Sequence, residues 1–143
     1  MQNMEKAVMT IDEINALLRA GFPRWDKAGV TIEAASYRAC RLRMGVSDHS
    51  IRPGGTVSGP TMFMLADTAL YIAVLASIGP KALAVTTSMS INFLRKPEKK
   101  DLIADCRLMK LGSRLAVGEV AILSDGDDEP VAHATGTYSI PPQ

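Results

Sequence analysis

Residues 58–75 read SGPTMFMLADTALYIAVL, and this stretch decides the fold. A Gly-Pro pair opens a run that is apolar on all sides, which predicts a long helix buried on every face. One carboxylate, Asp67, lies about two turns inside the run. Burying an acid among apolar side chains costs free energy unless another group pairs with it. Such an acid is often retained because it has a function, so Asp67 is a candidate functional residue.

Residues 61–78 also approach the minimum length of a membrane span. Asp67 near the middle, the absence of basic residues before the run and the strand-like sequence after it favour the central helix of a soluble fold instead. We expect no membrane association. The start of the chain, MQNMEKAVMT, lacks the features of a signal peptide, so we expect a cytoplasmic protein.

Alternation of apolar and polar residues predicts strands on both sides of the helix. In residues 30–44 the even positions are mostly apolar and the odd positions include Thr31, Glu33, Arg41 and Arg43, which predicts one long half-buried strand. In residues 83–93 the odd positions, from Leu83 through Val85 and Thr87 to Phe93, share the apolar face. Three further strands are predicted at 102–110, 114–123 and 130–140, with turns at Gly112-Ser113 and Asp125-Gly126.

A short amphipathic helix is predicted before the first strand. Thr10 followed by Glu13 forms a capping-box pattern, and Gly21 with Pro23 ends the helix. We expect residues 1–143 to form one α+β domain, with residues 1–24 as an outer helix and lead-in. Its long central helix is wrapped by a five- to six-stranded antiparallel sheet.

Composition excludes several classes of function. The net charge is +1 and no basic block occurs, so nucleic-acid binding has little support. Cys40 and Cys106 lie in apolar runs, and we expect buried free thiols. His49 and His133 lack the spacing of a metal site, so we predict no metal.

One sheet cannot cover every side of a helix that is apolar all round. A second copy of the chain is expected to close the remaining side, which predicts a homodimer.

The helix start and Asp67 together suit attack on a carbonyl group. The free N–H groups around Gly59 and the helix dipole favour a developing negative charge, and glycine lets a substrate come close to the backbone. Asp67 follows eight residues later. An N–H that polarises the oxygen and a carboxylate that activates water or attacks directly are the two parts that acyl transfer needs.

Four stretches resemble a known family in order: GGTVSGPTMFMLADTAL, AVTTSMSINFLRKP, LGSRLAVGEVAIL and VAHATGTYSI. From about Arg52 to Tyr138 the chain resembles the PaaI-type acyl-CoA thioesterases of the hotdog-fold superfamily. In that family two subunits join their sheets and form paired active sites between them. The resemblance implies that Gly59 donates to the oxyanion and that Asp67 is the base or the nucleophile.

The chain departs from the family pattern at the helix start. Ser58 stands where the family has histidine, and Pro60 replaces a second glycine. Ser58 keeps a hydroxyl that can donate a hydrogen bond. Arg52 stands where the family usually has Asn or Gln for the nucleophilic water. It could pair with Asp67, or hold a substrate carboxylate or phosphate.

Further residues enter through the resemblance. Thr86 matches a water-positioning Ser or Thr of some relatives. The odd-even alternation of the strand, however, places Thr87 on the side of the helix, so both threonines remain candidates. Cations at strand ends are candidates for coenzyme A phosphates. The substrate-binding candidates are Arg52, Pro60, Phe63, Met64, Tyr71, Arg95 and Arg114, with Lys96 and Lys110 as further cations, and Phe63, Met64 and Tyr71 as walls of an acyl tunnel.

The sequence therefore predicts an acyl-CoA thioesterase that releases free acid and thiol. It needs no cofactor, because coenzyme A is part of the substrate. We expect a homodimer or a dimer of dimers. Two alternatives remain: an enoyl-thioester hydratase or dehydratase that uses His49, and a non-catalytic protein that binds acyl-CoA.

Overall fold

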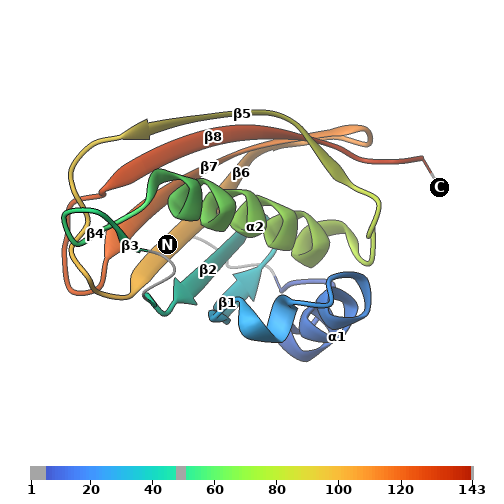
Figure 1. The fold of residues 1–143 in the computed structure, drawn as a ribbon. Coiled ribbons are helices and arrows are strands. Elements are labelled where there is room, and N and C mark those ends of the chain that lie inside the picture. Colours follow the sequence, from blue (N-terminus) through green and yellow to red (C-terminus); the bar gives the residue numbers. More distant parts are fainter. Residues whose placement is uncertain (1–5, 48–50, 143) are drawn as a thin grey trace.

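The computed structural model describes residues 6–47 and 51–142, and for Arg52 the backbone alone. In chain order the elements are α1 (Ile11–Gly21), the short 3-10 helix η1 (Trp25–Lys27), β1 (Val30–Ser36), β2 (Ala39–Met44), β3 (Ile51–Arg52), β4 (Thr56–Val57), α2 (Gly59–Ile78), β5 (Val85–Phe93), β6 (Leu102–Leu111), β7 (Leu115–Ser124) and β8 (Ala132–Ser139) (Figure 1).

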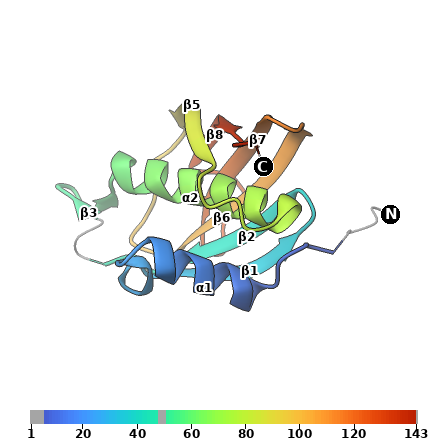
Figure 2. The same ribbon diagram turned by 90° about the vertical axis from the view of Figure 1, so that its right-hand side faces the viewer.

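Six strands form one antiparallel sheet in the order β1-β2-β6-β7-β8-β5. The sheet curves around α2, and α1 lies on the outside, below α2 and beside β1 (Figures 1 and 2). The short pair β3 and β4 forms a separate hairpin just before α2. The predicted α+β arrangement of a long helix wrapped by an antiparallel sheet is confirmed.

The central helix is buried as its sequence predicts. Ser58 caps its start, and Gly79, with φ of 96°, ends it in a conformation that favours glycine. By length and composition α2 could cross a membrane, but 67% of its most apolar window is buried inside the fold. It is therefore the core helix, which agrees with the choice made from sequence.

The prediction of one long strand over residues 30–44 is wrong. The chain turns back at Tyr37-Arg38, so β1 and β2 form a hairpin with Ser36 opposite Ala39. Arg38 takes the left-handed φ of 68° that the turn needs. A two-residue turn alone would reverse the odd-even alternation, because Ser36 and Ala39 face the same side, but a β-bulge between Ile32 and Ala34 restores it. The fully buried positions of both strands are therefore even-numbered, and without Gly or Asn the turn leaves no signal in the sequence.

The predicted face of β5 is also wrong at its start. Thr86 lies opposite Tyr138 and Ser88 opposite Thr137, so Thr87 is the extra residue of a β-bulge. The bulge shifts the alternation by one residue. Thr86 consequently faces α2, whereas Val85 is 55% exposed.

The outer helix and the cysteines match the predictions. The Thr10 hydroxyl accepts from the Glu13 N–H, and the Glu13 carboxylate accepts from the Thr10 N–H, which completes the capping box. Cys40 and Cys106 face each other on β2 and β6 as buried free thiols.

Two glycines let α2 approach the middle of the sheet. Gly118 on β7 and Gly136 on β8 lie opposite each other, and Leu70 of α2 packs above both. A Cβ at Gly136 would lie 2.6 Å from Leu70 Cδ1, and one at Gly118 would lie 2.7 Å from Leu70 Cδ2. Interatomic contacts this short do not occur, so larger residues here would push α2 outward.

We predict that Gly136→Ala destabilises the fold by about 1–3 kcal/mol, because the added methyl group overpacks the space below Leu70. Urea unfolding measures the change. Gly45→Ala is the control, since a Cβ there meets no atom within 4 Å. Leu70→Ala should cost less stability in the Gly136→Ala background than in the wild type. Strictly additive effects would contradict the proposed contact.

Candidate active site

Asp67 is held by two hydroxyl groups from the sheet. Thr86 on β5 donates to Asp67 Oδ1 at 2.5 Å, and Tyr138 on β8 donates to the same oxygen at 2.6 Å. The Tyr138 hydroxyl also lies 3.0 Å from the Asp67 backbone oxygen. Two donors on one oxygen fix the orientation of the carboxylate.

Tyr138 acts as a donor to Asp67 and not as a base. Burial, and then the hydrogen bond to Asp67, raise the pKa of the Tyr138 hydroxyl far above its ordinary value. Within the described part of the chain, Asp67 Oδ2 has no hydrogen-bond partner and Asp67 makes no ion pair. One carboxylate oxygen is therefore anchored, and the other is available for chemistry.

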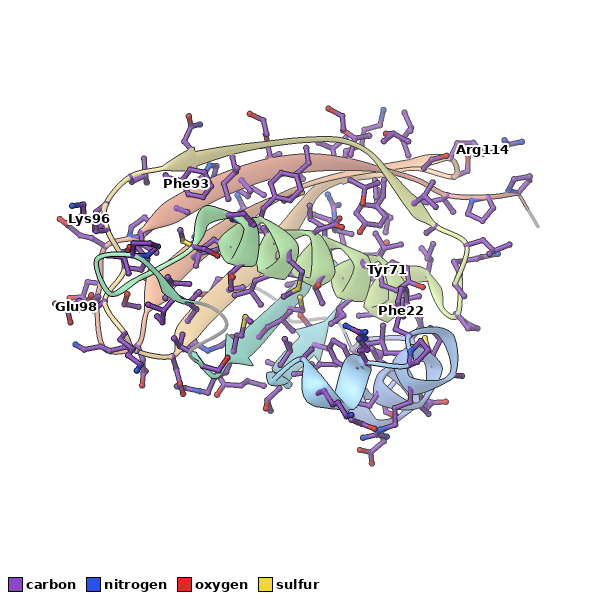
Figure 3. All side chains as sticks on the ribbon, in the orientation of Figure 1. Phe22, Tyr71, Phe93, Lys96, Glu98 and Arg114 are labelled. Carbon is purple, nitrogen blue, oxygen red and sulfur yellow. The ribbon has the colours of Figure 1, made fainter. Side chains whose placement is uncertain are left out.

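Asp67 opens into an apolar pocket of about 510 Å³, which we call the acid pocket. The floor is α2, one wall is the edge of the sheet at β5 and β8, and the opposite wall is α1 with η1. Its lining residues are Leu18, Phe22, Arg24, Trp25, Ala28, Met64, Asp67, Thr68, Tyr71, Ala84, Val85, Thr86 and Tyr138. Figure 3 shows Phe22 and Tyr71 close together where α1 meets α2, and their ring centroids are 5.9 Å apart.

The start of α2 offers one free backbone N–H. The Ser58 hydroxyl accepts from the Thr61 N–H at 3.3 Å, and Met62 N–H bonds the Ser58 carbonyl. Pro60 has no N–H. Among the described residues no group accepts from the Gly59 N–H. The sequence predicted several free N–H groups at the start of α2, whereas the described residues leave one, that of Gly59. The Ser58 hydroxyl caps the helix and lies 2.7 Å from the Thr61 hydroxyl.

Gly59 lies in a second depression of about 320 Å³, which we call the amide groove. It is lined by Thr56, Val57, Gly59, Met62, Phe93, Leu94, Arg95, Lys96 and Pro97. A Cβ on Gly59 would lie 3.1 Å from the end of the Phe93 ring, a tight contact that a shift of this exposed ring by a few tenths of an ångström would relieve. Arg95 binds Glu129 at 2.6 Å at the exposed margin.

Gly59 and Asp67 lie too far apart in one chain to act on one thioester. They are eight residues apart on α2, which corresponds to about 12 Å along the helix axis. An oxyanion donor and an attacking group span only about 8 Å, or about 10 Å with one bridging water. The two residues also line different cavities.

Only some of the other predicted site residues lie near Asp67. Met64 and Tyr71 line the acid pocket with Asp67 and Thr86, whereas Thr87 donates to the Thr137 carbonyl instead. Phe63 is 39% exposed and lines neither cavity, and Pro60 is exposed.

The predicted cations lie at two ends of the sheet. Figure 3 shows Lys96 at one end and Arg114 at the other. Arg114 lines a separate depression with Lys81, Gly112 and Ser113. The Arg52 side chain and His49 lie outside the described residues, so their predicted roles stay predictions.

Sequence reasoning missed Tyr138 and the wall formed by Phe22, Arg24 and Trp25. The sequence did contain a signal for Tyr138, because a tyrosine at an inward-facing position of the last strand needs a buried hydrogen-bond partner for its hydroxyl. The sequence contained no signal for the wall of Phe22, Arg24 and Trp25, because its position depends on where α1 packs. Within the described residues no cluster of His, Cys, Asp or Glu is suited to hold a metal.

Comparison with known proteins places the chain in a family. Residues 54–131 match the model of the Thioesterase superfamily. The chain belongs to this superfamily. An archaeal relative from Halobacterium salinarum, described as a "putative esterase", is 33% identical over 120 residues, or 78% of each protein.

Solved structures agree with the hotdog fold. A "putative thioesterase" from Silicibacter sp. is 47% identical, with a TM-score of 0.87 and coverage of 99% of this chain and 97% of that chain. The PaaI protein from the phenylacetic acid degradation operon of E. coli is 22% identical, with a TM-score of 0.77 and coverage of 90% and 91%. The predicted resemblance to PaaI-type hotdog thioesterases is confirmed, and the comparisons support a thioester hydrolase in general terms.

We predict that the Thr86 hydroxyl supports thioester hydrolysis by orienting Asp67. Thr86→Val keeps the shape and the β-branched side chain but loses the donor, and should lower kcat/KM by about tenfold, the scale of one hydrogen bond to a charged group. Thr86→Ser keeps the donor and should retain most activity. Equal rates for the two variants would exclude this role of the hydroxyl.

Proposed function

We propose that this protein is an acyl-CoA thioesterase that works as a homodimer, with each active site built from two subunits. The observation that carries the proposal is the pairing of an anchored carboxylate, Asp67, with a large apolar pocket. The reaction also needs an oxyanion donor, and the candidate for that role is Gly59. Within one chain Gly59 lies about 12 Å from Asp67 along the axis of α2.

An unpaired sheet edge supports the dimer. β5 is the last strand of the sheet, and most of its residues are exposed. Near the same edge Leu83 is 78% exposed and Phe93 is 52% exposed. Exposed apolar side chains beside an unpaired strand favour pairing with a second copy.

Antiparallel pairing of two β5 strands would bring the missing component to each site. The acid pocket lies at the start of β5, at Val85 and Thr86, and the amide groove lies at its end, at Phe93. A two-fold axis near the middle of β5 exchanges these two ends. The Gly59 N–H of the partner subunit would then face Asp67 of the first, and two equivalent sites would form.

The reaction follows from these groups. The Gly59 N–H would stabilise the oxyanion as the thioester carbonyl becomes tetrahedral. Asp67 Oδ2 would accept a proton from the attacking water, or attack the carbonyl carbon itself to give an anhydride that water then hydrolyses. Cleavage of the C–S bond releases coenzyme A, whose sulfur takes a proton, and the free acid.

Cations beside the amide groove suit the phosphates of coenzyme A. Lys96 is exposed and lies in the groove with Gly59, and Arg95, which is paired with Glu129, lies at its margin. Phosphate groups bind strongly to such donors. The nucleotide would therefore lie over one subunit while the acyl group enters the acid pocket of the other.

We predict that Asp67→Asn and Asp67→Ala each lower the rate of thiol release at least about a hundredfold, the scale of a lost general base. Asparagine keeps an oxygen that can accept from Thr86 and Tyr138, so that variant should remain folded. A panel of acyl-CoA thioesters and a thiol reagent measure the rates.

Asp105→Asn is the matched control, because Asp105 forms an exposed ion pair with Arg41 away from both cavities. It should keep the wild-type rate. Unchanged rates in both Asp67 variants would contradict the mechanism. Tight binding without thiol release would favour the non-catalytic alternative, and hydration of enoyl thioesters would favour the hydratase.

A further inference from the structure

The acid pocket contains a second charge that the proposed reaction does not use. Arg24 lies between Phe22 and Trp25 on the wall formed by α1 and η1, and it lines the pocket. It is the one basic side chain among the lining residues, and Asp67 is the one acidic side chain. The other lining residues are apolar, aromatic or threonine.

The guanidinium of Arg24 has no counter-ion within the described part of the chain. Asp26, two residues away, binds Arg19 at 2.8 Å instead. Other arginines are engaged: Arg43 binds Glu33, Asp101 and Asp125, and Arg107 binds Glu119. Arg24 forms no ion pair with Asp67 although both line one pocket.

The residues on both sides of Arg24 are fixed. Trp25 is buried, and its indole N–H donates to Asn15 at 2.9 Å. The ring of Phe22 packs edge-on against Tyr71 of α2. The backbone that carries Arg24 is therefore anchored at Phe22 and Trp25, and the exposed Arg24 side chain extends from it to line the pocket.

The two charges enter the pocket from different elements, Asp67 from the floor formed by α2 and Arg24 from the wall formed by α1 and η1. Thr86 on β5 and Tyr138 on β8 hold Asp67, whereas Arg24 precedes η1. Figures 1 and 2 show β5 and β8 on one side of α2 and α1 on the other. A thioester at Asp67 would direct its acyl chain across the apolar floor. The far end of that chain would meet the guanidinium.

We propose that Arg24 binds a carboxylate at the distal end of the acyl group, so that the substrate is the monothioester of a dicarboxylic acid. This inference rests on the proposed thioesterase function. Guanidinium and carboxylate form two parallel charge-assisted hydrogen bonds, which no apolar or amide end group can reproduce. The apolar floor suits the methylene groups between the thioester and the acid.

The test compares each dicarboxylic monothioester of coenzyme A with the matching terminal amide, over a series of chain lengths. The amide has nearly the same shape but no charge. The wild type should prefer the acid by about 10- to 100-fold in kcat/KM, the range for hydrogen bonds to charged groups. Arg24→Met should remove this preference by lowering kcat/KM for the acid alone.

Two variants control for the position and type of charge. Lys27→Met removes a positive charge from η1, the short helix that Arg24 precedes, but Lys27 does not line the pocket, so this variant should keep the preference. Arg24→Lys should recover part of it. Loss of the preference in Lys27→Met would show that general electrostatics, and not Arg24, selects the acid.

A second set of substrates shows whether Arg24 binds the acyl carboxylate or a phosphate of coenzyme A. Acyl thioesters of N-acetylcysteamine have no phosphate, and they should show the same preference and the same loss in Arg24→Met. If Arg24 binds phosphate instead, the variant raises KM for all coenzyme A esters alike and leaves N-acetylcysteamine esters unchanged. That result, or a wild type without preference, overturns the inference and leaves the hydrolase intact.

Absence of thiol release from every substrate would instead overturn the proposed function. The role of Arg24 is then decided by calorimetry with stable thioether analogues of the acid and the amide. Tighter binding of the acid, lost in Arg24→Met, would support it. Equal affinities would contradict it.

Discussion

The close approach of α2 to the sheet at Leu70 is the contact on which the rest of the structure depends. Leu70 packs onto two glycines that face each other on β7 and β8, where any side chain would collide with it. Asp67 lies one turn before Leu70 and Tyr71 one residue after it. The depth at which Leu70 packs therefore sets the distance from Asp67 to Tyr138 and Thr86, and so decides whether the carboxylate is held.

The same packing explains how an apolar helix tolerates an acid. Burying a carboxylate costs free energy, and an ion pair, hydrogen bonds or an open cavity offset this cost. Asp67 has both: two hydroxyl donors on one oxygen and a pocket beside the other. The β-bulge at Thr87 is part of this arrangement, because it turns Thr86 toward α2. Local irregularity next to a functional group is a common use of bulges.

The sequence predicted the overall fold well, since the apolar run of α2 and the alternation of the strands leave few ways to bury both. It predicted Asp67 and Gly59 as catalytic residues and Phe63, Met64 and Tyr71 as tunnel walls, and it offered Thr86 with Thr87. Of these, Asp67, Met64, Tyr71 and Thr86 line the acid pocket and Gly59 lines the amide groove. It could not separate those two threonines, because the bulge arises from pairing with β8. It missed the turn at Tyr37-Arg38, where the alternation continues, and Arg24, whose place depends on how α1 packs.

The central claim is that each active site combines Asp67 of one subunit with Gly59 of the other. Two variants, Asp67→Asn and Gly59→Pro, test it directly; proline removes the one free N–H while keeping a helical φ. Each variant alone should be inactive. Unfolded and refolded together in equal amounts, they should regain about a quarter of the wild-type rate, because half of the dimers would be mixed and each mixed dimer would hold one intact site. A mixture that stays inactive, from variants shown to be folded and to exchange subunits, would contradict a site shared between two chains.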